Sequence, residues 1–154
     1  MPLELTRENE TTVLCRRAFQ ASAEQLCRAH TDADLMRQWM LGPEGWEITD
    51  CESDPQAGGQ IQIVWRQLEG DGRFSLSGEY EVVDVPHRLV HVERMHLPET
   101  TPDNHVETVF MAKDDGTEVT LRMTLPDAAA LDAMLESGMA DGMEASYARL
   151  ESQL

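Results

Sequence analysis

The 154-residue chain is short of cysteine pairs, of basic residues and of long apolar runs, and each shortage excludes a class of protein. Its three cysteines, Cys15, Cys27 and Cys51, are odd in number and show no short paired spacing. They indicate neither a disulfide framework nor a zinc knuckle, so we expect reduced, mostly structural thiols. No apolar run is long enough to span a bilayer, and we expect no membrane partner.

The shortage of basic residues bears on partners. Twelve lysines and arginines stand against 29 acidic residues, which gives a net charge of -17. Such a chain repels phosphate backbones and anionic lipid surfaces, so we expect no nucleic-acid partner. The acidity either keeps the protein soluble or recruits a basic protein partner, and solubility is the simpler explanation. The first ten residues carry Glu4, Glu8 and Glu10 in place of a secretory signal, which predicts a cytoplasmic protein.

Signatures of common catalytic and metal sites are also missing. The histidines show no metal-ligand spacing, so we expect no metal and no cofactor. Serine nucleophile elbows, phosphate-cradling glycine loops and catalytic cysteine contexts are absent. One pair remains as a weak catalytic candidate, His91 with Glu93, two residues apart on a predicted strand. A solvent-facing pair or a structural hydrogen bond explains the same spacing.

What is present is the pattern of one α+β domain over residues 1–154, with 41% hydrophobic residues for its core. Alternation over Thr12–Phe19 predicts a first strand. Two short helices follow, over about Ala23–Ala29 and Asp32–Gln38. Each begins with a capping pattern, Ser22 with Gln25 and Thr31 with Asp34.

From Trp46 to Leu125 the chain predicts an antiparallel meander, with turn residues at 54–59, 70–72, 85–87, 98–104 and 114–116. Alternation is clearest in the last strand. The same alternation predicts the inward-facing residues of three other strands. They are Ile61, Ile63 and Trp65 on one strand, Leu76, Tyr80 and Val82 on the next, and Val106 and Phe110 on another. In the strand from Leu89 to Leu97 two phases stay open: inward are either Leu89, His91, Glu93 and Met95, or Val90, Val92, Arg94 and His96.

The last segment, from Asp127 to about Gln153, predicts one long helix capped by Asp127. Its apolar stripe includes Leu131, Leu135, Met139, Met143 and Leu150, together with Gly138, Gly142 and Ser146. Each glycine should cost roughly 1 kcal/mol of helix stability relative to alanine. Either the helix approaches the sheet closely there, or the missing side chains leave room for a guest.

Methionines and aromatic residues supply a candidate wall for an apolar pocket. Nine methionines either fill irregular gaps in the core or adapt to variable guests. Trp39 either caps the mouth of a cavity or plugs the end of the core. The candidate ligand-binding residues are Trp39, Met40, Trp46, Trp65, Tyr80, His91, Glu93, Met95, Phe110, Met123, Leu135, Gly138, Met139, Gly142, Met143 and Tyr147.

A series of short motifs, in this order, resembles one known family. They are Ala18-Phe19-Gln20-Ala21-Ser22, Thr31-Asp32, Gln38-Trp39, Gly42-Pro43-Glu44-Gly45-Trp46, Asp54 with Gly58-Gly59, Gly78-Glu79-Tyr80, Arg88-Leu89-Val90, Gly116-Thr117, Ser137-Gly138-Met139, Gly142, Ser146-Tyr147 and Leu150. The chain is similar over nearly its whole length to the START-like homologues of the activator of the ninety-kilodalton heat-shock-protein ATPase. Their superfamily also contains polyketide cyclases and plant pathogenesis-related ligand binders.

The resemblance implies a helix-grip fold, in which a curved antiparallel sheet of about six or seven strands surrounds a long C-terminal helix and a cavity. The family has an apolar aromatic residue near His91, which favours the inward phase for Leu89, His91 and Glu93. This chain departs from the family there, because His91 would place a polar group in the cavity.

Three functions follow as expectations. The first is binding of a small hydrophobic molecule, with selectivity from His91, Glu93, Tyr80 or Tyr147. The second is an enzyme of the cyclase or hydrolase type, in which the cavity orients an aromatic or lipid-like substrate. The third is a co-chaperone-like module that acts on a protein partner. A homodimer stays open in each case.

Overall fold

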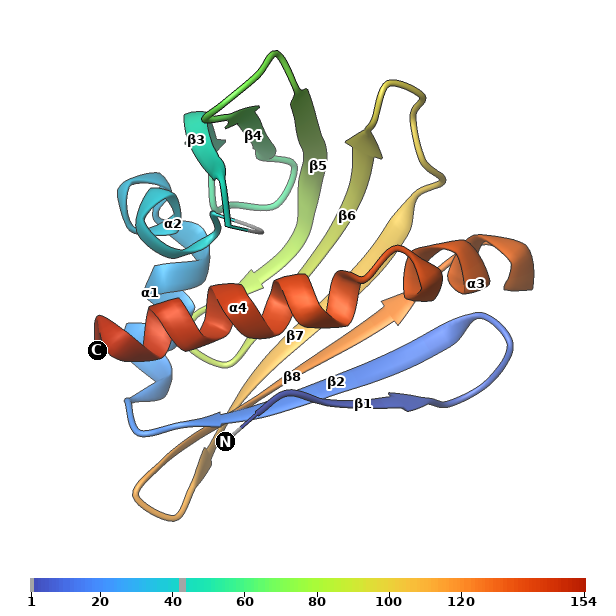
Figure 1. Cartoon of the computed structure of the whole chain (residues 1–154). Coiled ribbons are helices and arrows are strands. Elements are labelled where there is room, and N and C mark those ends of the chain that lie inside the picture. The colour runs from blue at the N-terminus through green and yellow to red at the C-terminus, as the bar shows by residue number, and fades with distance from the viewer. Residues whose placement is uncertain (1, 42–43) are drawn as a thin grey trace.

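The computed structural model describes residues 2–41 and 44–154, so Gly42 and Pro43 of the motifs above lie outside the described residues. Eight strands form one antiparallel sheet in the order β1-β2-β8-β7-β6-β5-β4-β3. The sheet curves, and helix α4 crosses its concave side (Figure 1). The predicted helix-grip fold is confirmed, with eight strands in place of six or seven.

The strands and helices have the following bounds. The strands are β1 (Glu4–Arg7), β2 (Thr12–Phe19), β3 (Trp46–Ser53), β4 (Gln60–Gln67), β5 (Arg73–Asp84), β6 (Arg88–His96), β7 (Asn104–Lys113) and β8 (Gly116–Thr124). The helices are α1 (Ala23–Thr31), α2 (Ala33–Trp39), α3 (Ala128–Glu136) and α4 (Met139–Ser152). The first predicted strand is β2, with unchanged bounds. Strand β1 was missed because all four of its residues are exposed and carry no alternating pattern.

The two short helices are confirmed, and one of the two caps is wrong. Ser22 and Gln25 form the predicted capping box, because each side chain accepts a hydrogen bond from the other residue's backbone N–H. The second helix is capped by Asp32, whose Oδ1 accepts from the backbone of Asp34 at 2.9 Å. Thr31 instead ends α1, where its hydroxyl donates to the carbonyl oxygen of Cys27.

The register of β6 decides between the two open phases. His91 lies opposite Tyr80 on β5 and Val106 on β7, which are 3% and 1% exposed. Directly paired residues share a face of the sheet, so the phase with Leu89, His91, Glu93 and Met95 faces inward. The inward assignment of Val82 is wrong, because a β-bulge between Tyr80 and Val82 shifts the parity and Val83 packs on the core instead.

The single C-terminal helix is also wrong: it is two helices, and Gly138 separates them. Gly138 is exposed and has φ 84°, a left-handed conformation that breaks the run of helical hydrogen bonds. Asp127 caps α3 as predicted, and its Oδ1 accepts from the backbone of Ala130 at 2.8 Å. The pattern failed here because Gly138 occupies a position of the apolar stripe and reads as part of it.

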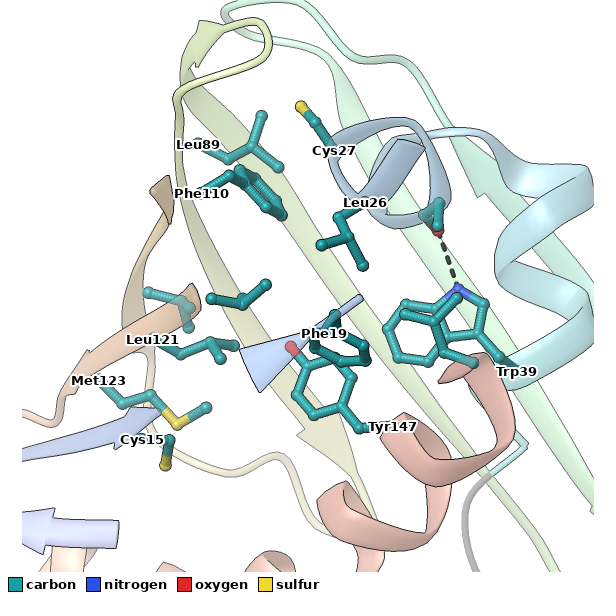
Figure 2. Packing of buried hydrophobic residues seen from close by; sticks show 14 of the residues in the cluster. Cys15, Phe19, Leu26, Cys27, Trp39, Leu89, Phe110, Leu121, Met123 and Tyr147 are labelled. Atoms are coloured by element: carbon teal, nitrogen blue, oxygen red, sulfur yellow. Dashed lines mark hydrogen bonds between the residues drawn. The ribbon is translucent and has the colours of Figure 1, made fainter. Parts of the chain in front are cut away.

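Two groups of buried residues form the core. In the first, Figure 2 shows Phe19, Tyr147 and Trp39 gathered near Leu26 of α1, with Leu89 and Phe110 on the sheet. The second lies on β3, β4 and β5 against α2 and consists of Met36, Cys51, Ile61, Ile63, Trp65 and Tyr80. Met40 and Val83 pack against both groups. All three cysteines are free and buried within them.

Two glycines should respond to alanine in opposite directions. A Cβ at Gly78 would lie 2.3 Å from the carbonyl oxygen of Val92, so Gly78→Ala should destabilise the protein by about 2–3 kcal/mol. A Cβ at Gly142 meets no atom of the described chain within 4 Å, and Gly142→Ala should stabilise it by about 0.5–1 kcal/mol. Urea denaturation followed by tryptophan fluorescence measures both. Equal effects would mean that the strands do not approach as described.

Candidate functional site

Helix α4 is held along one flank by a buried arginine on β2. The side chain of Arg17 is 3% exposed. Its guanidinium donates to both carboxylate oxygens of Glu144 at 3.1 Å and to Glu151 at 2.7 Å. The hydrogen bonds from Arg17 hold the pKa of Glu144 below its usual value. Glu144 therefore lies on the flank of α4 that faces β2.

The opposite flank of α4 has open space at Gly142, and we call it the free flank. Gly142 lies two residues before Glu144, or about 200° around the helix, and therefore on the opposite flank. Beside it, a Cβ at Gly142 would have no neighbour within 4 Å in the described chain. Close approach of the helix to the sheet is therefore not the reason for this glycine.

Half-buried apolar side chains pack against the two core groups. Unlike Phe110, Met123 and Tyr147, which are at most 6% exposed, they keep accessible surface while packing on the core. We call them the methionine group: Met40, Met95, Leu135, Met139 and Met143. They come from the C-cap of α2 and from β6, α3 and α4, and all five were among the predicted lining residues.

Open hollows in the surface lie elsewhere. One of about 320 Å³ is lined by Arg66, Arg73 and their neighbours at the β4–β5 turn. Another of about 370 Å³ lies between the α1–α2 junction and Ser53 with Pro55. Neither contains a predicted lining residue. A molecule at the inner face must therefore displace methionine side chains rather than enter one of these hollows.

Polar groups from β6 and β7 face the same interior. His91 Nε2 lies 2.6 Å from Glu93 Oε1, with side chains 17% and 23% exposed. The spacing that suggested this pair thus brings the two side chains together. Directly opposite Glu93 on β7 is Asn104, which is 8% exposed. The sequence had assigned Asn104 to a turn, so its role here was missed.

A second histidine, His30 of α1, was also missed. Its Nδ1 lies 2.7 Å from the carbonyl oxygen of Leu26, which can only accept, so Nδ1 carries the proton. Nε2 then accepts from the hydroxyl of Tyr147 at 3.0 Å. The available signal was position: His30 follows Leu26 by four residues, on the buried face of α1.

Burial sets the ionisation of these groups. It lowers the pKa of His30 to about 4, against a smaller opposing effect of the hydrogen bond to Leu26. It also raises the pKa of Tyr147. At neutral pH His30 and Tyr147 are therefore both uncharged.

The tryptophans and Tyr80 are engaged in packing. Trp39 is 4% exposed, stacks on Tyr147 at 5.3 Å and donates to the carbonyl oxygen of Ala29, so it plugs the core. Trp65 stacks on Phe74, and Trp46 meets the same ring edge-on. The Tyr80 hydroxyl pairs with Ser53 at 2.7 Å. Gly138 lies outside the group, exposed at the junction of α3 and α4.

Two further observations concern residues 2–41 and 44–154. Within them, no three histidine, cysteine or acidic side chains are grouped so as to hold a metal ion. No helix in this part of the chain has the length and apolarity needed to cross a bilayer.

The curved sheet, the gripped helix and the polar interior define a START-like protein of the helix-grip class. The chain belongs to the family of activator of Hsp90 ATPase homolog 1-like proteins, whose model matches residues 20–154. This confirms the family resemblance drawn from the motifs. Among curated proteins, no sequence matches the chain.

Several solved structures share the fold. A crystal structure of a protein from Rhodobacter sphaeroides is 31% identical and superposes with a TM-score of 0.93 over 99% of this chain and 97% of that one. A protein from Mycobacterium smegmatis is 20% identical, with a TM-score of 0.86 over 99% and 97% of the two chains. An AHSA1-like protein from Aeromonas hydrophila is 19% identical, with a TM-score of 0.77 over 92% and 93%. The last two bear on the fold alone.

The lowered pKa of His30 makes stability depend on pH. As pH falls below 6.5, His30 binds a proton in the unfolded chain, whereas in the folded chain it stays neutral until about pH 4. The stability that neutral His30 contributes to the fold is therefore complete above pH 6.5 and is lost between pH 6.5 and 4. We expect a loss of up to ~3 kcal/mol. In His30→Gln the fall over this range should be smaller, as measured by urea denaturation at several pH values. The exposed His87→Gln serves as control, and equal slopes in both variants would contradict the prediction.

Proposed function

We propose that the protein binds a small, mainly apolar molecule at the inner face of the sheet, beside the free flank of α4. The observation that carries this proposal is the methionine group, half-buried against the core, together with the His91–Glu93 pair on the inner face of β6. Half-buried apolar side chains gain stability when a guest covers them. Methionine is unbranched and polarisable, so these side chains can move aside and repack on the guest at little cost.

Two other features support this location. The imidazole of His30 lies within 5.7 Å of the rings of Trp39, Phe110 and Tyr147, so a polar group stands among aromatic surfaces there. The fold is also one that commonly binds ligands. Few polar groups in a mainly apolar surround are typical of ligand sites, where they orient the guest.

Filling the space beside Gly142 should weaken binding. We expect the fluorescent probe N-phenyl-1-naphthylamine to bind with enhanced emission, and Gly142→Leu to lower its affinity about tenfold by occupying that space. The matched control is Ala148→Leu, on the exposed side of the same helix. Fluorescence titration measures both, with thermal unfolding to show that each variant folds.

Two results would count against the proposal. Equal loss of affinity in Gly142→Leu and Ala148→Leu would place the probe away from the free flank of α4. No enhanced emission with the unaltered protein would remove the binding function itself for a guest of this kind.

A second candidate function is proton transfer on the bound molecule, favoured by the 2.6 Å contact between His91 and Glu93. With Glu93 accepting from Nε2–H, Nδ1 of His91 is left as the base. Replacement of either residue by glutamine should then lower turnover of a bound substrate by about 10²-fold or more. Unchanged turnover in both variants would leave binding as the function of the site.

A further inference from the structure

Asn104 has a buried amide oxygen that nothing in the described chain satisfies. The residue opens β7, is 8% exposed and faces the interior opposite Glu93. Its Oδ1 accepts no hydrogen bond from any described residue. Among the described residues, its Nδ2 donates only to the sulfur of Met134 on α3, at 3.8 Å.

Turning the amide around does not remove the problem. The two ends of an asparagine side chain can be exchanged, but a thioether sulfur is a weak acceptor and no donor. Since the sulfur can accept from Nδ2 but cannot donate to Oδ1, the orientation in the structure is the favoured one, and Oδ1 is the atom left without a partner among the described residues. Leaving such a group unpaired costs about 1–3 kcal/mol, so a buried orphan of this kind calls for an explanation.

A second free acceptor lies next to it. Glu93 and Asn104 are direct cross-strand partners, so their Cβ atoms are separated by about 4.5–5.5 Å. Oε1 of Glu93 is taken by His91, whereas Oε2 has no hydrogen bond among the described residues. Its side chain is 23% exposed and therefore reachable. Two oxygen acceptors thus belong to directly paired residues of β6 and β7, at the point where Asn104 contacts Met134 of α3.

We propose that the ligand carries a hydroxyl group at its polar end, and that this group donates a hydrogen bond to the acceptor pair formed by Glu93 Oε2 and Asn104 Oδ1. This inference rests on the binding function proposed above and adds the chemical group at the polar end of the ligand. The apolar body then lies along the methionine group. Met134 and Leu135 of α3, which are half-buried, would then cover the hydroxyl end of the ligand.

The same pair disfavours a carboxylate. A carboxylate has no proton to donate at neutral pH, and beside Glu93 it would add a like charge in a poorly solvated place. An apolar head of the same size leaves both acceptors unpaired. A site built to hydrogen-bond a hydroxyl rejects analogues without one for this reason.

Three naphthalenes of similar size separate these cases: 2-naphthol, 2-methylnaphthalene and 2-naphthoate. Isothermal titration calorimetry at pH 7.5 should give an affinity for 2-naphthol at least tenfold above that for either other compound. Simple apolar burial predicts the reverse order for the first two, because a methyl group is more apolar than a hydroxyl. Equal affinities, or tighter binding of 2-methylnaphthalene, would overturn the inference and leave the proposed binding function intact. Absence of binding by all three and by N-phenyl-1-naphthylamine would overturn both.

Two variants locate the recognition. Asn104→Leu keeps the shape and removes the orphan, so it should keep or raise the melting temperature while the preference for 2-naphthol over 2-methylnaphthalene falls at least fivefold. Glu93→Gln removes the negative charge and should raise the affinity for 2-naphthoate relative to 2-naphthol.

The variants also separate recognition from a structural role. Loss of stability in Asn104→Leu with an unchanged preference would mean that Asn104 serves packing or a trapped water, and would overturn the assignment. If Asn104→Leu does not fold, Glu93→Gln tests the assignment alone. An unchanged order of affinities for the three naphthalenes in Glu93→Gln would overturn the assignment of the acceptor pair as well.

Discussion

The position of α4 depends on the ion pairs between Arg17 and two carboxylates of the helix. Arg17 is almost fully buried on β2, and an isolated guanidinium there would cost several kcal/mol. Glu144 and Glu151, seven residues apart, offset this cost from positions two turns apart on one flank. The backbone N–H of Leu3 also donates to Glu144, so the chain before β1 is tied to the same point. The opposite flank is tied toward the C-terminal end of the helix, where Arg149 donates to the carbonyl oxygen of Trp39, and space stays open at Gly142.

The interior combines closely packed aromatic rings with half-buried methionines. The rings of Phe19, Trp39 and Tyr147 meet within about 5.5 Å of one another in successive contacts. Methionines of the methionine group pack against the same core residues and keep accessible surface. The neutral imidazole of His30 bonds to Tyr147, and His91 pairs with Glu93 on the sheet. The interior thus combines apolar cover with a few directed polar groups, the composition expected of a site for an amphiphilic guest.

The inward direction of Glu93 and Asn104 follows from sheet register and could not be read from the local sequence alone. Two phases of β6 fitted the alternation equally well, since polar and apolar residues occur in both. The pairing of His91 with Tyr80 and Val106 decides the phase. A bulge beside Glu81 then reverses the parity of β5, which no two-residue alternation reveals. Asn104 looked like a turn residue because it follows Pro102 and Asp103 and all three residue types are common in turns, yet it begins a strand.

By itself the sequence determined the class of fold, the bounds of β2, the capping box at Ser22 and the cap at Asp127, because these depend on neighbours within a few residues. It also named every member of the methionine group as a candidate lining residue, although the direction of Met95 stayed open with the phase of β6. Only the tertiary structure decided that Gly138 breaks the last helix, that Arg17 holds one flank of α4, and that His30 and Asn104 join the interior. The physical reason is that each depends on partners brought together by folding, 117 residues apart for His30 and Tyr147 and 127 for Arg17 and Glu144.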